Sequence, residues 1–126
     1  MSDLGEVLTG AGLVGLGAGA AAAEHDLYGG AMMTVAGLLA VLGAQEADKV
    51  AAWRMADIAA MRALLGDAAP ATGEGLTLGE LDEAWATLSR ALIAHHAGVA
   101  DGSEADRAIL AFYRESCARR ELVWPQ

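Results

Sequence analysis

The sequence predicts an all-α protein, a four- or five-helix up-down bundle that self-associates, folded as a single helical domain over residues 1–126. Hydrophobic residues make up 55% of the chain but aromatic residues only 5%, and there are only two prolines, a composition typical of helices. Two segments begin with the spacing of a helix-capping box. No segment shows the regular alternation of polar and apolar residues that indicates a strand.

The first helix is expected over residues 3–24 and is unusually rich in glycine, with Asp3 near its N-terminal cap. Each glycine inside a helix costs about 1 kcal/mol relative to alanine, so another interaction must compensate. Gly12, Gly15 and Gly19 are spaced three and four positions apart and therefore share one face. We expect this face to make close contact with another helix.

The second helix is expected over residues 31–42, after a turn at Gly29–Gly30. It is apolar on every face, which indicates burial in the bundle or in an oligomer interface. A break near Gly43 would separate it from a third helix over residues 46–65. One continuous helix over residues 31–65 is the alternative.

Two further helices are expected over residues 78–97 and 104–121. Thr77 and Glu80 have the spacing of a capping box at the start of the first of them, and Ser103 is a suitable cap for the second. The apolar positions of the first are spaced alternately three and four apart, which is typical of a packed helix seam. They are Leu78, Leu81, Trp85, Leu88 and Leu92.

Two uncharged stretches, residues 7–23 and 27–45, are borderline in length for membrane helices. A membrane hairpin that turns at Glu24-His25-Asp26 and carries a soluble helical tail is therefore an alternative. The flanking residues are acidic and lack the Lys or Arg that orients membrane helices, and the acidic start argues against a secretory signal peptide. These features favour a soluble, cytoplasmic protein.

Charge and motif content exclude several function classes. With 17 acidic and 8 basic residues the net charge is −9, so the chain repels phosphate, and nucleic-acid binding is not expected. Cys117 is the only cysteine, which excludes an intrachain disulfide. Residues 10–15 match the dinucleotide-binding pattern G-x-G-x-x-G, but no credible strand precedes them, so no cofactor is expected.

Arg54 and Asp57 are the first candidate ligand-binding residues, because both lie within an apolar face of the helix expected over residues 46–65. At a spacing of three they can pair. A charge pair in an apolar face is costly unless it is fully hydrogen-bonded, which favours a structural ion pair. In the alternative, Arg54 holds an anionic ligand and Asp57 orients it. Glu46 lies on the same face and could join either arrangement.

His95 and His96 are the candidate metal ligands, with Asp48 and Glu46 as partners. In an up-down bundle these acidic residues would lie at the same end as the two histidines, which makes this metal arrangement geometrically plausible. The Glu-x-x-His pattern of di-iron bundles is absent.

No catalytic motif is present, so the sequence favours a non-catalytic interaction or structural module. Self-association as a homodimer is expected, because the first two helices carry more apolar surface than so small a chain can bury. The alternatives are a small-ligand or metal-binding enzyme at the candidate residues above, and the membrane hairpin.

Overall fold

The computed structural model describes residues 3–125, and these residues form helices and no strand, which confirms the all-α class. The chain divides into two compact units. Unit 1 combines the chain up to Lys49 with the segment from Leu122 onward, and unit 2 is Val50–Glu121. The helices are α1 (Leu4–Ala22), α2 (Leu27–Leu65), α3 (Leu78–His96) and α4 (Glu104–Arg119), with the 3₁₀ turn η1 (Gly66–Ala68) after α2.

The expected turn at Gly29–Gly30 is wrong, because both glycines lie inside α2. The helix begins at Leu27, and Asp26 caps it by accepting a hydrogen bond at 3.0 Å from the backbone N–H of Gly29. Gly30 is buried against the backbone of Ala23. Gly30 therefore allows α2 to approach the backbone at the end of α1 closely, and the glycine pair does not interrupt the helix.

The expected break near Gly43 is also wrong, so the helices predicted over residues 31–42 and 46–65 are parts of α2, which is continuous over 39 residues. The chain does not reverse direction there. One glycine costs a helix only about 1 kcal/mol, and no proline follows to end it. Val41 and Ala44, on either side of Gly43, are buried and keep this part of the helix packed.

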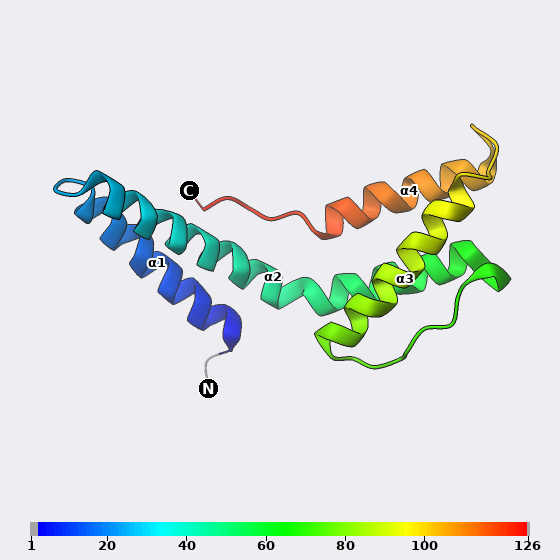
Figure 1. Cartoon of the computed structure of the whole chain (residues 1–126), viewed down its shortest axis with the longest axis horizontal. Coiled ribbons are helices and arrows are strands. Elements are labelled where there is room, and N and C mark those ends of the chain that lie inside the picture. Colours follow the sequence, from blue (N-terminus) through cyan, green and yellow to red (C-terminus); the bar gives the residue numbers. More distant parts are fainter. Residues whose placement is uncertain (1–2, 126) are drawn as a thin grey trace. The chain divides into compact units, whose positions relative to one another are not determined.

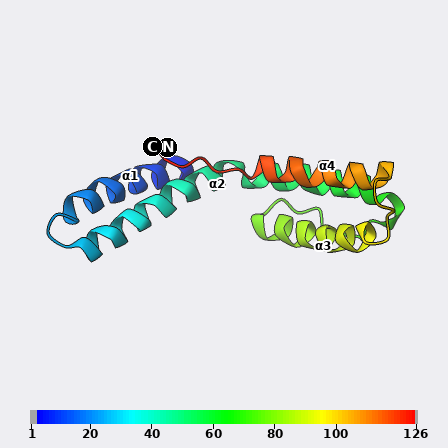
Figure 2. The same cartoon turned by 90° about the horizontal axis from the view of Figure 1, so that it is seen from above.

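In unit 1, α1 and the N-terminal half of α2 form an antiparallel hairpin (Figures 1 and 2). Asp3 caps α1 by accepting a hydrogen bond at 2.7 Å from the N–H of Glu6. Apart from Val41, the buried positions between the two helices are small residues spaced seven apart, a spacing that keeps one face toward the partner helix. They are Gly5, Gly12 and Gly19 on α1, and Gly30, Gly37 and Ala44 on α2.

In unit 2, the C-terminal half of α2 packs with α3 and α4 around a core of large apolar side chains (Figure 2). Leu88 and Leu92 of α3 are fully buried in it. The other members are Ile58, Met61, Leu65, Leu81, Ala84, Ile109 and Phe112. Unit 2 therefore has a packed apolar interior of its own.

The predicted helix starts of unit 2 are confirmed. Thr77 and Glu80 form a reciprocal capping box at the start of α3. The hydrogen bonds from Thr77 hold the pKa of Glu80 below its ordinary value. Ser103 caps α4 by accepting a hydrogen bond at 3.1 Å from the N–H of Asp106. At the end of α2, Gly66 has φ +54°, a left-handed conformation that favours glycine.

Candidate functional site

The outward surface of the unit 1 hairpin is the most unusual feature of the molecule, because it carries most of the large apolar side chains of the hairpin. Their exposed fractions range from 43% at Met33 to 77% at Leu27 and Tyr28. The full set is Leu4, Val7, Leu13 and Val14 on α1, and Leu27, Tyr28, Met32, Met33, Val35 and Leu39 on α2. Apart from Val41, the buried residues of the hairpin are small, and most of its large apolar residues are outside, which is the reverse of a soluble domain.

These apolar side chains surround the hairpin and do not form a single patch. At about 100° per residue, the exposed apolar positions of α2, from Leu27 to Leu39, occupy about two thirds of the circumference of the helix. Those of α1 occupy about half of its circumference. The remaining arc of each helix contains the buried small residues through which α1 and α2 contact each other. We call this contact the seam; its small residues are Gly5, Gly12, Gly19, Gly30, Gly37 and Ala44. A single flat partner would cover only part of such a surface.

The seam brings the two backbones into direct contact. A Cβ atom added to Gly37 would lie 2.6 Å from the backbone nitrogen of Leu16 and 2.7 Å from the carbonyl oxygen of Gly12. A Cβ on Gly12 would lie 2.9 Å from the backbone nitrogen of Val41. These contacts explain the glycines at the seam, such as Gly12 and Gly37, where a side chain would not fit. Close backbone packing of this kind is common between membrane helices, where small residues line the interface.

The two helices of the hairpin also have the dimensions of membrane spans. Two segments, Leu4–Ala22 and Leu27–Ala68, are long and apolar enough to cross a membrane, judged by length and composition. Their most apolar windows have mean hydropathies of 1.3 and 1.7, and only 17% of the residues in each window are buried. The 19 residues of α1 span about 28 Å, close to the roughly 30 Å of a bilayer's hydrocarbon core.

The predicted pairing of Arg54 with Asp57 is wrong, although both residues lie in unit 2. Arg54 forms an ion pair with Asp82 of α3, with 2.9 Å between Nη2 and Oδ1. Its guanidinium also lies 5.2 Å from the centre of the Trp53 ring. Asp57 has a different partner, Arg119 of α4, so each of the two charges pairs with a different neighbouring helix.

Asp57 is fully buried and its carboxylate is satisfied within unit 2. Oδ2 accepts hydrogen bonds from Trp85 Nε1 at 3.0 Å and Ser116 Oγ at 2.6 Å. Oδ1 accepts one from Arg119 Nε at 2.9 Å, and Arg119 Nη2 lies 2.7 Å away. A buried carboxylate with these partners joins all three helices, so its role is structural.

A mostly apolar groove of about 330 Å³ lies beside this network. Its hydroxyl and indole donors, Ser116 and Trp85, already bond to Asp57. Burial raises the pKa of Tyr113, which therefore stays neutral. Arg120 lies at the rim, where its guanidinium is 5.5 Å from the centre of the Trp53 ring and 5.8 Å from that of Trp85. The remaining lining residues are Met61, Ser89, Leu92, Ile93, Phe112 and Cys117.

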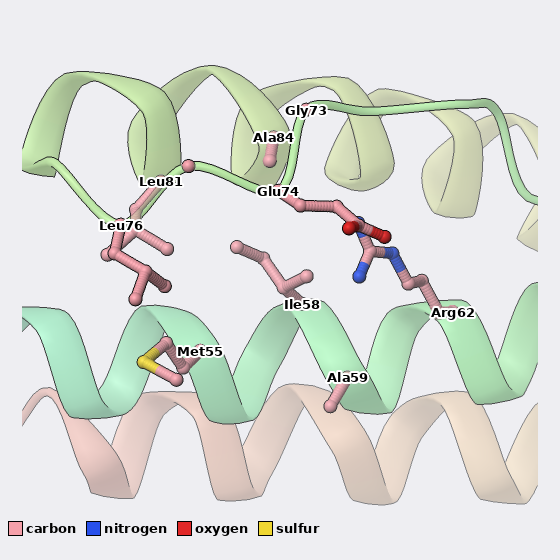
Figure 3. Close-up of a pocket in the computed structure, with 10 residues that line it drawn as sticks. Met55, Ile58, Ala59, Arg62, Gly73, Glu74, Leu76, Leu81 and Ala84 are labelled. Atoms are coloured by element: carbon pink, nitrogen blue, oxygen red, sulfur yellow. The ribbon is translucent and has the colours of Figure 1, made fainter.

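A second cavity lies under the loop between η1 and α3 (Figure 3). Its floor is apolar, with Ile58 and Leu81, while the side chains of Arg62 and Glu74 extend toward each other above it. Arg62 Nη2 donates a hydrogen bond of 2.5 Å to Thr72 Oγ1, which ties the loop to α2. At about 210 Å³ the cavity is smaller than most ligand sites, so it is best explained as loop packing.

The candidate metal ligands do not gather into a site. Within residues 3–125, no group of three or more His, Cys, Asp or Glu side chains is placed to hold a metal ion. His96 is bonded to Asp106, with 2.7 Å between Nε2 and Oδ1, and this bond lowers the pKa of Asp106. His95 and Asp48 are exposed. Glu46 was also expected to join Arg54 and Asp57, but it belongs to unit 1, whereas those two residues belong to unit 2.

No protein-family model, curated protein or solved structure matches this chain, so function is inferred from the surfaces and contacts described above. Sequence reasoning missed Ser116 and Arg119 as partners of Asp57. Their positions three apart on the predicted last helix were a usable signal, since a buried aspartate requires donors from a neighbouring helix. It also missed the seven-residue spacing of the hairpin glycines, which is visible in the sequence.

Proposed function

We propose that the protein is a non-catalytic, membrane-anchored helical module, in which the α1–α2 hairpin inserts into a bilayer and unit 2 is a soluble interaction or structural domain. One observation carries this proposal: the hairpin exposes large apolar side chains around both helices and packs on glycine inside. Exposing that surface to water costs a free energy of roughly 25 cal/mol for each Å² of apolar area. A bilayer covers it from all sides.

The distribution of charge along the hairpin supports this proposal. No charged side chain occurs over residues 7–23 or 27–45, whereas Glu24 and Asp26 lie at the turn. Both uncharged stretches can therefore lie in hydrocarbon, with the acidic turn in water on one side. Both inserted stretches are helical apart from the turn, so most of their backbone groups are hydrogen-bonded within a helix, as a bilayer requires.

The basic residues favour one orientation of the hairpin. The turn between α1 and α2 contains no Lys or Arg. The residues directly after the second uncharged stretch are acidic too, but Lys49 and Arg54 follow within nine residues of its end. Lys and Arg near membrane helices are retained on the cytoplasmic side. The proposed topology therefore translocates the turn and keeps unit 2 in the cytoplasm.

A homodimer formed through the hairpin is the second candidate. The same exposed apolar side chains would favour self-association in water, because monomers rarely expose so large an apolar surface. A symmetric dimer covers one side of the hairpin, however, and the exposed apolar positions of α2 occupy about two thirds of the helix circumference. The bilayer is therefore the better match.

Vesicle flotation distinguishes the two candidates. The full chain is expressed, extracted and reconstituted with phosphatidylcholine vesicles, which are then floated through a density gradient at high pH. The proposal expects the protein to float with the vesicles and to aggregate in buffer without detergent. Recovery as a soluble, monodisperse dimer that stays at the bottom of the gradient would refute it and support the homodimer.

A further inference from the structure

We infer that the C-terminal segment Leu122–Trp124 is an interfacial anchor, which the side chain of Gln45 holds against the membrane surface with Trp124 among the lipid headgroups. This inference rests on the proposed membrane insertion of the hairpin. It adds a second contact with lipid, at a place that the two spanning stretches do not include. The partner is the interface between the headgroups and the acyl chains.

Two hydrogen bonds hold this segment in unit 1. Gln45 Nε2 donates to the carbonyl oxygen of Val123 at 2.6 Å, and the N–H of Val123 donates to Gln45 Oε1 at 2.7 Å. The amide side chain therefore pairs with both backbone groups of one residue, as a neighbouring strand would. Figures 1 and 2 both show the C-terminal segment beside α2. The contact fixes the segment at one position along the helix.

That position is the end of the second uncharged stretch. Gln45 is its last residue, and Glu46 is the first charged residue that follows. In an inserted hairpin this boundary lies where hydrocarbon gives way to headgroups. Tyr28 lies near the opposite boundary, 17 residues earlier on α2 and 77% exposed. The distance along the helix between these two residues is about 26 Å, close to the thickness of the hydrocarbon core.

The side chains of the segment suit this location. Val123 and Trp124 are 67% and 66% exposed although both are apolar, so the protein leaves them without cover. Trp is enriched at membrane interfaces, because its ring is apolar while its indole N–H can bond to headgroups or water. With Tyr28 at one boundary and Trp124 at the other, the hairpin has an aromatic side chain at each membrane surface.

Depth-dependent quenching of tryptophan fluorescence tests this inference. The full chain and its Trp124→Phe variant are reconstituted in vesicles whose lipids carry bromine either near the glycerol backbone or near the chain ends. Subtracting the two emission spectra isolates Trp124, because Trp53 and Trp85 contribute equally to both. We expect shallow bromine to quench the difference signal and deep bromine to quench it much less.

A variant that lacks the two hydrogen bonds between Gln45 and Val123, which we call the clamp, and a matched control complete the experiment. Gln45→Ala removes both hydrogen bonds to Val123 and should abolish the shallow quenching of Trp124 while the protein still floats with vesicles. Gly43→Ala changes the same part of α2 at a position with open space around it, and it should leave the quenching intact. If Gln45→Ala retains full shallow quenching, the clamp assignment is overturned.

The outcomes separate this inference from the proposed function. Protein that floats with vesicles but shows equal Trp124 emission with brominated and plain lipid would overturn the anchor and leave the hairpin inserted. Protein that does not float would overturn both. Floating protein with shallow quenching of Trp124 that depends on Gln45 supports both.

Discussion

Replacing Gly37 with alanine should open the hairpin, because its neighbours are backbone atoms that cannot move aside. The added Cβ would lie 2.6 Å from the nitrogen of Leu16, whereas ordinary contact begins at 3.4 Å. The two helices must therefore separate locally by about 0.8 Å. A gap of that size forfeits about a quarter to a half of the dispersion attraction at each contact.

Gly43→Ala is the matched control for this substitution, since the same change is made on the same helix where nothing lies within 4 Å. Both variants gain about 1 kcal/mol of helix propensity, so this gain cancels in the comparison. What remains is the overpacking at Gly37, typically about 1–3 kcal/mol. The ratio of closed to open hairpin should therefore fall by about fivefold or more relative to Gly43→Ala.

NMR in mild detergent micelles measures this ratio. Amide shifts of Gly12 and Leu16, which are unchanged in both variants, report the closed seam, and sodium dodecyl sulfate is titrated in until the seam opens. The midpoint should move to lower dodecyl sulfate for Gly37→Ala and should stay at or above that of the unmodified protein for Gly43→Ala. Equal midpoints for the two alanine variants would show that the close backbone contact does not hold the hairpin together.

The remaining predictions concern unit 2. Asp57→Ala leaves Arg119 without its carboxylate and should destabilise unit 2 by about 3–5 kcal/mol, read from the loss of near-ultraviolet circular dichroism on heating; a change below about 1 kcal/mol would contradict the structural role. The lowered pKa of Asp106 means that its bond to His96 stabilises the fold above the ordinary pKa of 3.8, and this contribution is lost as the pH falls through the lowered value. Asp106→Asn should therefore flatten the acid side of a profile of Tm against pH, and an unchanged profile would exclude this linkage. Thr77→Ala should cost about 1 kcal/mol and lower the Tm, whereas no change would mean that the capping box contributes nothing.

Features encoded by local spacing could be predicted from the sequence. The capping box at Thr77 and Glu80 and the cap at Ser103 are set by side chains three residues apart, so no tertiary information was needed. The buried Leu81, Leu88 and Leu92 likewise follow from the apolar spacing of one helix. In each case the pattern lies within a single element.

The continuity of α2 and the partners of Asp57 could not be predicted in the same way. Gly29, Gly30 and Gly43 are ordinary signals of a turn or break, but tertiary contact overrides them in this chain: Gly30 is packed against α1, while buried neighbours hold the helix at Gly43. Arg119 replaces Arg54 as the partner of Asp57 because α4 packs against that side of α2. The continuity of α2 and the partner of Asp57 both depend on which helices pack against each other, and this is not encoded in the spacing within one helix.

The orientation of the hairpin side chains changed the functional interpretation most. From the sequence, an apolar helix with acidic flanks favoured burial within the protein. The structure instead buries Gly12, Gly19 and Gly37 and exposes most of the large apolar residues, including Val14 and Leu39. Small residues take the interior because they allow the two helices to approach closely, and the large residues are then left on the outside.

Cysteine accessibility in sealed vesicles tests membrane insertion of the hairpin most directly. Single cysteines replace Val14, Met33 or Leu39 in a Cys117→Ser background; the three positions lie on different sides of the hairpin. If the bilayer surrounds the hairpin, a membrane-impermeant maleimide should label none of them until detergent is added, even in vesicles opened by freezing and thawing. Rapid labelling of one or two positions in opened vesicles, as expected when a dimer covers a single side, would contradict insertion.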